Sequence, residues 1–260
     1  MEPLGFSLQD IYRILLIMFR TGAVLMSVPA FGHVSIPRML RLWLVLILAF
    51  MLFPSAVVSE IRLPQTNIQL AVVILSELAV GFAIGFVVII LFAAVQFAGH
   101  LIGLQMGLAV ASVMDPMSAG EISIIGEFYY LLSIVVFLLI DGHHFVIEAL
   151  VRSYEVIPVG GGVFSGGLGE YIVTMTGTLF IVGVKLSAPV IITLFIVNVI
   201  LGIISKTVPQ MNVFVVGFPL ALGVGLIMIR YSLPLFKTVF LDAFSFLRID
   251  ILRIITLMRG

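Results

Sequence analysis

The longest stretch of this chain without a charged residue runs from Leu78 to Met114, which is 37 residues without Asp, Glu, Lys or Arg. A straight helix of about 20 apolar residues is enough to cross the hydrocarbon core of a bilayer. The stretch is therefore too long for one simple crossing. We expect it to be bent, re-entrant or partly enclosed by protein.

Apolar residues dominate most of the remaining chain, in segments that read approximately as 8–31, 40–58, 68–98, 99–114, 124–147, 171–204, 209–233 and 235–257. No sizeable polar region separates these segments, so the sequence predicts a single all-α membrane domain over residues 1–260. Pro189 and Pro219 fall inside apolar runs, where proline removes a helical hydrogen bond and favours a kink or a break. We therefore expect broken and re-entrant helical hairpins.

Five glycines recur at a spacing of four residues within two of these segments, at Gly81, Gly85, Gly99, Gly103 and Gly107. Glycines at this spacing share one helical face and let another backbone approach closely. Simple packing within the chain is one interpretation. An extended face for packing against other helices is the other, and the length of the array favours it.

Composition makes the membrane interpretation firm. Hydrophobic residues make up 62% of the chain and charged residues only 10%, whereas soluble domains average about 45–50% and about 25%. The net charge is zero, which gives no indication of nucleic acid or of an acidic substrate. The chain has no cysteine, so disulfides and thiolate metal sites are excluded.

Several charged residues nevertheless fall within or beside apolar segments, namely Arg13, Arg20, Glu77, Glu127 and Lys185. An unpaired charge in the membrane costs about 3 kcal/mol or more, so we expect partners in protein or water for these residues. Glu77 and Lys185 are the candidates for functional intramembrane charges. The alternative is an intersubunit salt bridge or a polar contact that orders the assembly, and it is favoured because no chain of acidic residues leads away from Glu77.

The sequence gives little support for enzyme chemistry, a cofactor or a metal site. The four histidines lack the H-E-x-x-H pattern, and the adjacent pair His143-His144 should point in different directions on a helix. Asp141-Gly142 beside this pair is typical of a helix terminus. No G-x-S-x-G elbow is present.

The stretch from residue 106 to residue 120 combines small residues with methionines and a break at Asp115-Pro116. Methionine is flexible and fills irregular gaps, so such a loop suits a compliant seal in a pore. A hairpin turn between two crossings is an equally good interpretation of the residues alone. The candidate plug consists of Met106, Gly107, Leu108, Ala109, Val110, Ala111, Ser112, Val113, Met114, Asp115, Pro116 and Met117.

Segments distributed over nearly the whole chain resemble the FliR family of type III export-gate subunits. They are SVPAFGHVSIPRMLRLWLVLILAFMLFP (27–54), GHLIGLQMGLAVASVMDP (99–116), DGHHFVIEALVRSYEVIPVG (141–160) and APVIITLFIVNVILGIISKTVPQMNVFVVGFPLALGVG (188–225). One departure is Asp141, where many relatives carry Asn before Gly-His, followed here by the additional His144.

The resemblance implies a non-enzymatic export-gate fold, related to a joined FliP and FliQ. It implies one copy of this chain in a helical ring with FliP and FliQ, with FlhB and FlhA nearby, in the bacterial inner membrane at the flagellar basal body. Such a ring forms the channel entrance for unfolded flagellar proteins, and the loop at 106–120 acts as its plug. A small secondary transporter is the main alternative, although no convincing internal repeat supports it, and a membrane subunit without a pore is the third.

Overall fold

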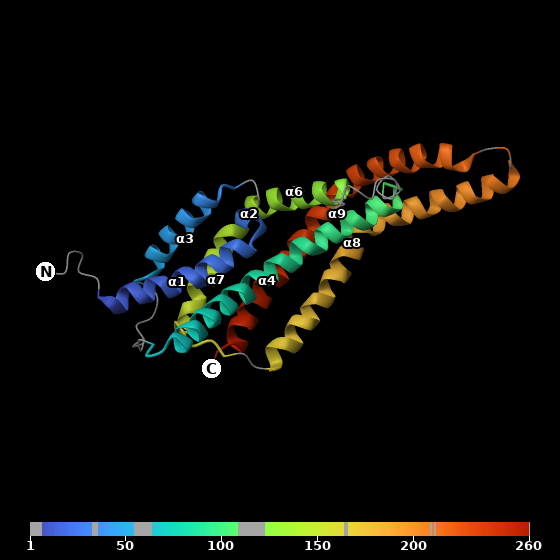
Figure 1. Cartoon of the computed structure of the whole chain (residues 1–260). Coiled ribbons are helices and arrows are strands. Elements are labelled where there is room, and N and C mark those ends of the chain that lie inside the picture. The colour runs from blue at the N-terminus through green and yellow to red at the C-terminus, as the bar shows by residue number, and fades with distance from the viewer. Residues whose placement is uncertain are drawn as a thin grey trace. The chain divides into compact units, whose positions relative to one another are not determined.

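The computed structural model describes residues 7–32, 36–54, 64–108, 123–163, 166–208, 210 and 212–259, and the ordered elements of these residues are all helices (Figure 1). The predicted all-α class is confirmed. The helices in chain order are α1 Leu8–Ser27, α2 Pro29–Gly32, α3 Arg38–Leu52, α4 Asn67–Gln105, α6 Ile124–Leu139, α7 Gly142–Val156, α8 Gly166–Thr207 and α9 Val213–Leu257.

Three described helices, α4, α8 and α9, are long and apolar enough to cross a membrane, and the bent pair formed by α6 and α7 would add a fourth span if counted as one. In α4, 67% of the most apolar 18-residue stretch is buried within the chain, against 22% in α8 and 22% in α9. Most of this stretch of α4 is thus enclosed by protein, which is one of the alternatives expected for the long uncharged run. The apolar surfaces of α8 and α9 are left largely uncovered.

The helices are more continuous than the apolar segments predicted. Residues 68–98 and the start of 99–114 form the single helix α4, and α9 runs through Pro219 and Pro234 without ending. A proline removes one helical hydrogen bond, whereas ending a helix leaves several N–H and C=O groups without partners, which is costly in apolar surroundings. The predicted boundary between 209–233 and 235–257 is therefore absent. By contrast, the segment 124–147 is divided by the break between α6 and α7, where Asp141 has a left-handed backbone at φ 56°.

Residue contacts divide the chain into two compact units. The first comprises 1–90, 137–176 and 245–260, and the second comprises 91–136 and 177–244. Helices α4, α8 and α9 each contribute residues to both units. The single domain over 1–260 remains a prediction.

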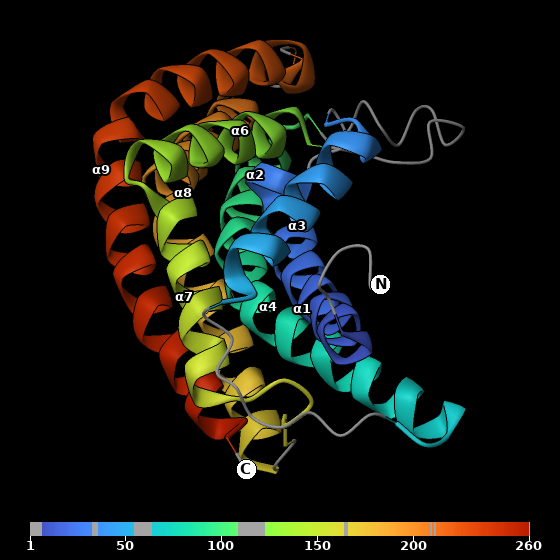
Figure 2. The same ribbon diagram turned by 90° about the vertical axis from the view of Figure 1, so that its left-hand side faces the viewer.

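In the first unit, α1 packs against α3 and against the start of α4 (Figure 2). Helix α1 begins at a capping box, in which the Ser7 side chain accepts from the Asp10 N–H and the Asp10 carboxylate accepts from the Ser7 N–H. The bond from the Ser7 side chain lowers the pKa of Asp10. The buried face of α1 includes Leu16, Ile17 and Val24.

In the second unit, aromatic rings form much of the described core. Tyr129 meets Phe236 edge to face with 5.3 Å between ring centroids, and Phe236 stacks on Phe240 at 5.9 Å. The hydroxyl groups of Tyr129 and Ser232 lie 3.3 Å apart, which gives the buried phenol a polar partner. Aromatic pairs of this kind stabilise a core beyond the area they bury.

Candidate functional site

The candidate charge Glu77 lies in α4 and is paired within its own chain. Its Oε2 lies 2.7 Å from Nε of Arg20 in α1, its Oε1 lies 3.0 Å from Arg20 Nη2, and both side chains are fully buried. This is a bidentate pair, the strong arrangement of arginine with a carboxylate. This geometry therefore supports the interpretation of Glu77 as one half of a polar contact. The partner lies in the same chain rather than in another subunit.

Arg20 also holds the end of α7. Its Nη1 donates to the carbonyl oxygens of Ser153 at 3.2 Å and of Ile157 at 3.0 Å. These carbonyls belong to the last turn and the cap of α7, where helical partners are lacking. The Arg20 guanidinium also lies 4.3 Å from the ring centroid of Tyr154.

Glu77 completes this junction from the other side. Its Oε1 accepts a hydrogen bond of 2.6 Å from the N–H of Gly160, a glycine with φ 80° in the turn after α7. The pair therefore joins α1, α4 and the end of α7. Sequence reasoning placed both Arg20 and Glu77 in apolar segments but did not pair them, because they lie 57 residues apart.

The second candidate charge, Lys185, lies on α8 in a different setting. It is exposed, and it makes no hydrogen bond or ion pair with any described residue. Ile181, Val184 and Ile192 on the same helix are also exposed. Lys185 is thus a lone cation on an apolar surface.

The predicted packing glycines mark two helix crossings on α4. A Cβ atom added to Gly81 would lie 2.5 Å from the carbonyl oxygen of Arg20, and one added to Gly85 would clash with the Ser27 side chain. Both contacts are with α1 in the first unit. In the second unit, a Cβ on Gly99 would lie 2.5 Å from the Cα of Gly126 in α6.

Gly103 has less crowded surroundings than Gly99, and Gly107 lies beyond the end of α4. A Cβ on Gly103 would lie 2.8 Å from the hydroxyl of Ser123. Gly107 lies beyond α4 with φ 80°, so it does not continue the helical face that the spacing predicted. Its N–H donates to Leu104 and the N–H of Leu108 donates to Gly103, which is the Schellman pattern that ends a helix.

Only the start of the candidate plug belongs to the described residues. Met106 is 1% exposed, and a Cβ on Gly225 of α9 would lie 2.7 Å from its Cγ. Leu108 follows in the turn after α4. The remaining members lie outside the described residues, namely Ala109, Val110, Ala111, Ser112, Val113, Met114, Asp115, Pro116 and Met117.

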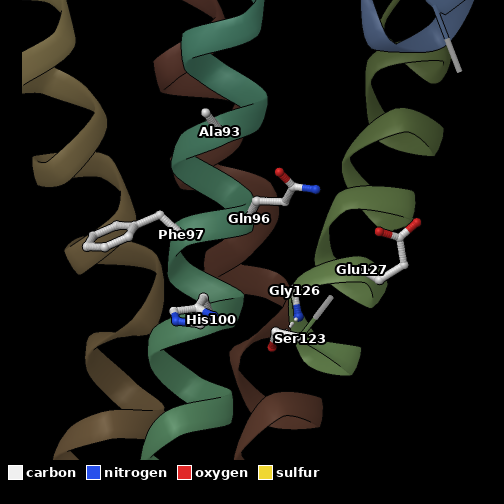
Figure 3. A pocket seen from close by; sticks show the side chains of 7 residues that line it. All are labelled: Ala93, Gln96, Phe97, His100, Ser123, Gly126 and Glu127. Atoms are coloured by element: carbon white, nitrogen blue, oxygen red, sulfur yellow. Dashed lines mark hydrogen bonds between the residues drawn. The ribbon is translucent and has the colours of Figure 1, made fainter. Parts of the chain in front are cut away.

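A groove of about 380 Å³ with several polar side chains lies between α4 and α6 in the second unit (Figure 3). Its lining consists of Ala93, Gln96, Phe97, His100, Ser123, Gly126 and Glu127. The Gln96 side chain points toward α6 in Figure 3, and neither the Gln96 nor the Glu127 side chain has a hydrogen bond or ion pair with a described residue. Sequence reasoning did not assemble this groove, although Gln96 and His100 stand one helical turn apart on α4.

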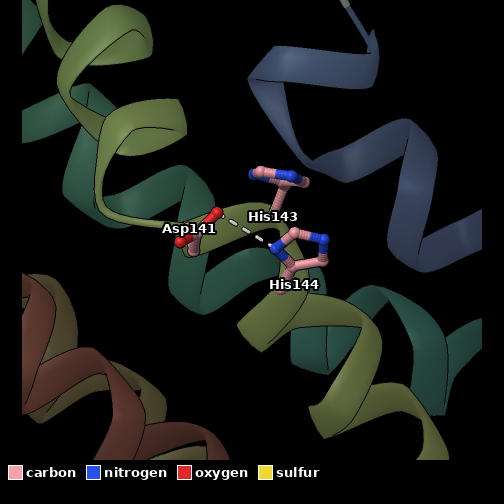
Figure 4. A group of neighbouring side chains, drawn as sticks. All are labelled: Asp141, His143 and His144. Carbon is pink, nitrogen blue, oxygen red and sulfur yellow. Dashed lines mark hydrogen bonds and ion pairs between the residues drawn. The ribbon is translucent and has the colours of Figure 1, made fainter.

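A cluster of possible metal ligands lies at the break before α7 (Figure 4). Asp141, His143 and His144 each offer one ligand atom, and these atoms all lie within 4.8 Å of one another. The prediction that the adjacent histidines point apart is wrong here, because their ring centroids are only 4.1 Å apart. Side chains on a helix lean toward its N-terminus. His143 and His144 lie in the first turn of α7, so no preceding turn of the same helix keeps their rings apart.

The amino-acid sequence matches a known protein family over most of its length. The family model described as "Bacterial export proteins, family 1" matches residues 11–247. The chain belongs to this family. The resemblance to FliR is confirmed by curated relatives that carry that name.

These relatives are flagellar biosynthetic proteins FliR from three bacteria. The Bacillus subtilis protein is 32% identical over 236 residues, 89% of this chain and 90% of the relative. The Escherichia coli protein is 30% identical over 218 residues, 84% and 83% of the two chains. The Aquifex aeolicus protein is 33% identical over 222 residues, 85% of each.

Family membership and the apolar helices together make this chain a membrane-embedded component of a flagellar export apparatus. Among the described residues, no geometry tests whether Glu77, Lys185 or the glycine array takes part in export.

Proposed function

We propose that this chain is the export-gate subunit that forms, with FliP and FliQ, the channel entrance for unfolded flagellar proteins. In this proposal one copy completes a helical ring in the bacterial inner membrane, with FlhB and FlhA nearby. The chain has no catalytic role in this proposal. It forms part of the wall of a pore and keeps that pore closed until a substrate arrives.

The exposed face of α8 is the observation that carries the proposal. Ile181, Val184 and Ile192 are exposed beside Lys185, which has no partner among the described residues. Lipid could cover the apolar side chains, but a lysine facing hydrocarbon is costly. A neighbouring subunit that presents an apolar helix with one carboxylate satisfies both requirements.

Helix length supports the same conclusion. At about 1.5 Å per residue, α4, α8 and α9 are each roughly 60 to 70 Å long. The hydrocarbon core of a bilayer is about 30 Å thick. Helices of 39, 42 and 45 residues therefore have long apolar portions that need protein rather than lipid around them.

The groove between α4 and α6 adds a polar contact surface. Gln96, His100 and Glu127 present hydrogen-bonding groups on membrane-type helices. Lipid supplies no partner for such groups. A polar side chain of a neighbouring subunit, or water in a channel, suits this groove.

Residues 106–117 are proposed as the plug of the pore, on the basis of the family resemblance. The described part is compatible with this role, because α4 ends at Gln105 and the Schellman turn at Gly107 redirects the chain. Met106 remains buried.

Purification in mild detergent tests the assembly. The chain should be recovered with FliP and FliQ in a fixed and unequal ratio, with one copy of this chain per complex. A chain that remains a monomer when all three proteins are produced together would contradict the gate. Binding of a small solute by that monomer would favour a transporter instead.

A further inference from the structure

The break between α6 and α7 brings together three side chains that the export function does not use. We propose that Asp141, His143 and His144 form a binding site for one divalent transition-metal ion. This inference is independent of the proposed gate, because it depends only on side chains at the start of α7. All three belong to the first unit.

The spacing of the potential ligand atoms suits one ion. Nδ1 of His144 lies 3.1 Å from Oδ1 of Asp141, joined by a hydrogen bond (Figure 4). Two ligands of a tetrahedral zinc ion stand about 3.3 Å apart, given metal–ligand bonds of roughly 2.0–2.1 Å. An ion inserted between these two atoms replaces the hydrogen bond without separating the side chains.

His143 supplies the third ligand. Its ring lies 4.1 Å from the ring of His144, with an angle of 35° between the ring planes. Its Nδ1 is closed off from solvent and has no hydrogen-bond partner. A ring nitrogen without a partner carries a desolvation cost, so a nearby cation improves the environment of this imidazole.

The site has room for the adjustment that coordination needs. The side chains of Asp141 and His144 are 72% and 70% exposed, so rotation of either displaces few packed atoms. The backbone is different, because Asp141 is the only described non-glycine residue with a positive φ, at 56°. That conformation directs the chain so that the carboxylate of Asp141, just before α7, faces the imidazoles of His143 and His144 in the first turn of α7.

The donor set selects the class of ion. Two imidazoles and one carboxylate suit Zn²⁺, Cu²⁺ and Ni²⁺, whereas Mg²⁺ and Ca²⁺ prefer oxygen ligands alone. Water would occupy the remaining position of a tetrahedral ion. The ion would link Asp141 in the break to the first turn of α7 and thereby stiffen this junction.

Calorimetric titration with zinc chloride tests the proposal directly. The chain is purified in its membrane complex without a polyhistidine tag, treated with a chelator and dialysed. We expect one Zn²⁺ per copy of this chain. A parallel titration with Co²⁺ should give the visible absorption of a tetrahedral nitrogen- and oxygen-ligated ion.

Three variants assign the ligands. His143→Ala and His144→Ala should each weaken Zn²⁺ binding by at least about tenfold, as expected when a coordinating group is lost. Asp141→Asn should also weaken it while keeping the backbone, because Asn tolerates the left-handed conformation. Glu155→Gln is the matched control, an exposed carboxylate at the other end of α7, and should leave the affinity unchanged.

The absence of saturable Zn²⁺ binding to the unmodified complex would overturn the proposal. Equal affinity in the unmodified chain and in all three variants would also overturn it, by locating the ion elsewhere. Recovery of each variant in the complex, measured in the same preparation, separates loss of binding from loss of folding. The gate proposal is unaffected by either result, since it makes no use of the ion.

Discussion

Arg20 Nε lies 2.7 Å from Glu77 Oε2, and neither side chain is exposed to solvent. Arg152 and Glu148 form a second pair with the same separation of 2.7 Å, but their side chains are 51% and 48% exposed. The two pairs share the closest distance but differ in burial, and only the buried pair has a second hydrogen bond and further bonds to the end of α7. This contrast allows the contribution of the whole buried junction to be measured within one chain.

Glu77→Gln should destabilise the protein strongly, because it leaves the buried Arg20 without its counter-charge. Breaking one partner of a buried pair costs about 3–5 kcal/mol. Glu148→Gln should cost at most about 1 kcal/mol, as for other exposed pairs. Thermal unfolding of the purified complex measures both changes. Equal shifts in melting temperature for the two variants would show that the buried pair contributes no more to stability than the exposed pair.

Gly99→Ala should separate α4 from α6 within the second unit and reduce recovery of the protein. The added methyl group meets backbone atoms of Gly126 and Ile125 at 2.5 to 2.8 Å, and backbone cannot rotate away. Overpacking of this kind costs about 1–3 kcal/mol. The measurement is the yield and melting temperature of the complex.

Two other glycines calibrate that result. Gly103→Ala should be milder, because the nearest atom is the Ser123 hydroxyl, which can rotate, whereas Gly103→Leu should block assembly. Gly202→Ala in α8 has nothing within 4 Å and should be neutral or stabilising by up to about 1 kcal/mol. A Gly99→Ala variant as stable as Gly202→Ala would refute the close crossing.

Lys185→Met should lower the stability of the assembled complex if a neighbouring subunit supplies a carboxylate to this lysine. The substitution keeps the apolar stem and removes the charge, so the partner carboxylate is left unpaired. Lys206→Met, in the last turn of the same helix, is the control and should change little. Unchanged or increased stability of the Lys185 variant in detergent-purified complex would mean that no required pair forms there.

Shortening the segment from Leu108 to Met114 should leave assembly intact but make the membrane permeable to small ions or dyes. Export should be retained in such a variant, since passage requires displacement of the plug. Dye or ion uptake by cells that carry the complex gives the measurement, with the unmodified complex as reference. Normal assembly together with a tight membrane would identify the segment as a structural turn and locate the seal elsewhere.

The sequence by itself determined the all-α membrane class, because composition and long uncharged runs leave no soluble alternative. It also indicated a helix terminus at Asp141-Gly142 and a glycine face, of which Gly81, Gly85 and Gly99 lie close to atoms of another helix. These features depend on local properties, namely hydrophobicity, backbone freedom and helical spacing. Local properties can be read directly from neighbouring residues.

Helix continuity was decided only by tertiary structure. Pro219 and the boundary between the apolar segments 209–233 and 235–257 predicted interruptions, yet α9 continues through both positions, since unpaired backbone groups in apolar surroundings cost more than one missing hydrogen bond. Gly107 matched the spacing of a packing glycine but lies in the turn that ends α4. Whether such a glycine lies inside the helix depends on where the helix ends, and the four-residue repeat does not specify that end.

The partners of the charged and polar side chains were likewise settled only by the folded chain. Arg20 and Glu77 are far apart in sequence, and pairing them requires α1 and α4 to pack side by side. His143 and His144 converge with Asp141 because of a left-handed residue at the break. Spacing along a sequence gives the direction of a side chain on an ideal helix, whereas helix ends and crossings decide which side chains meet.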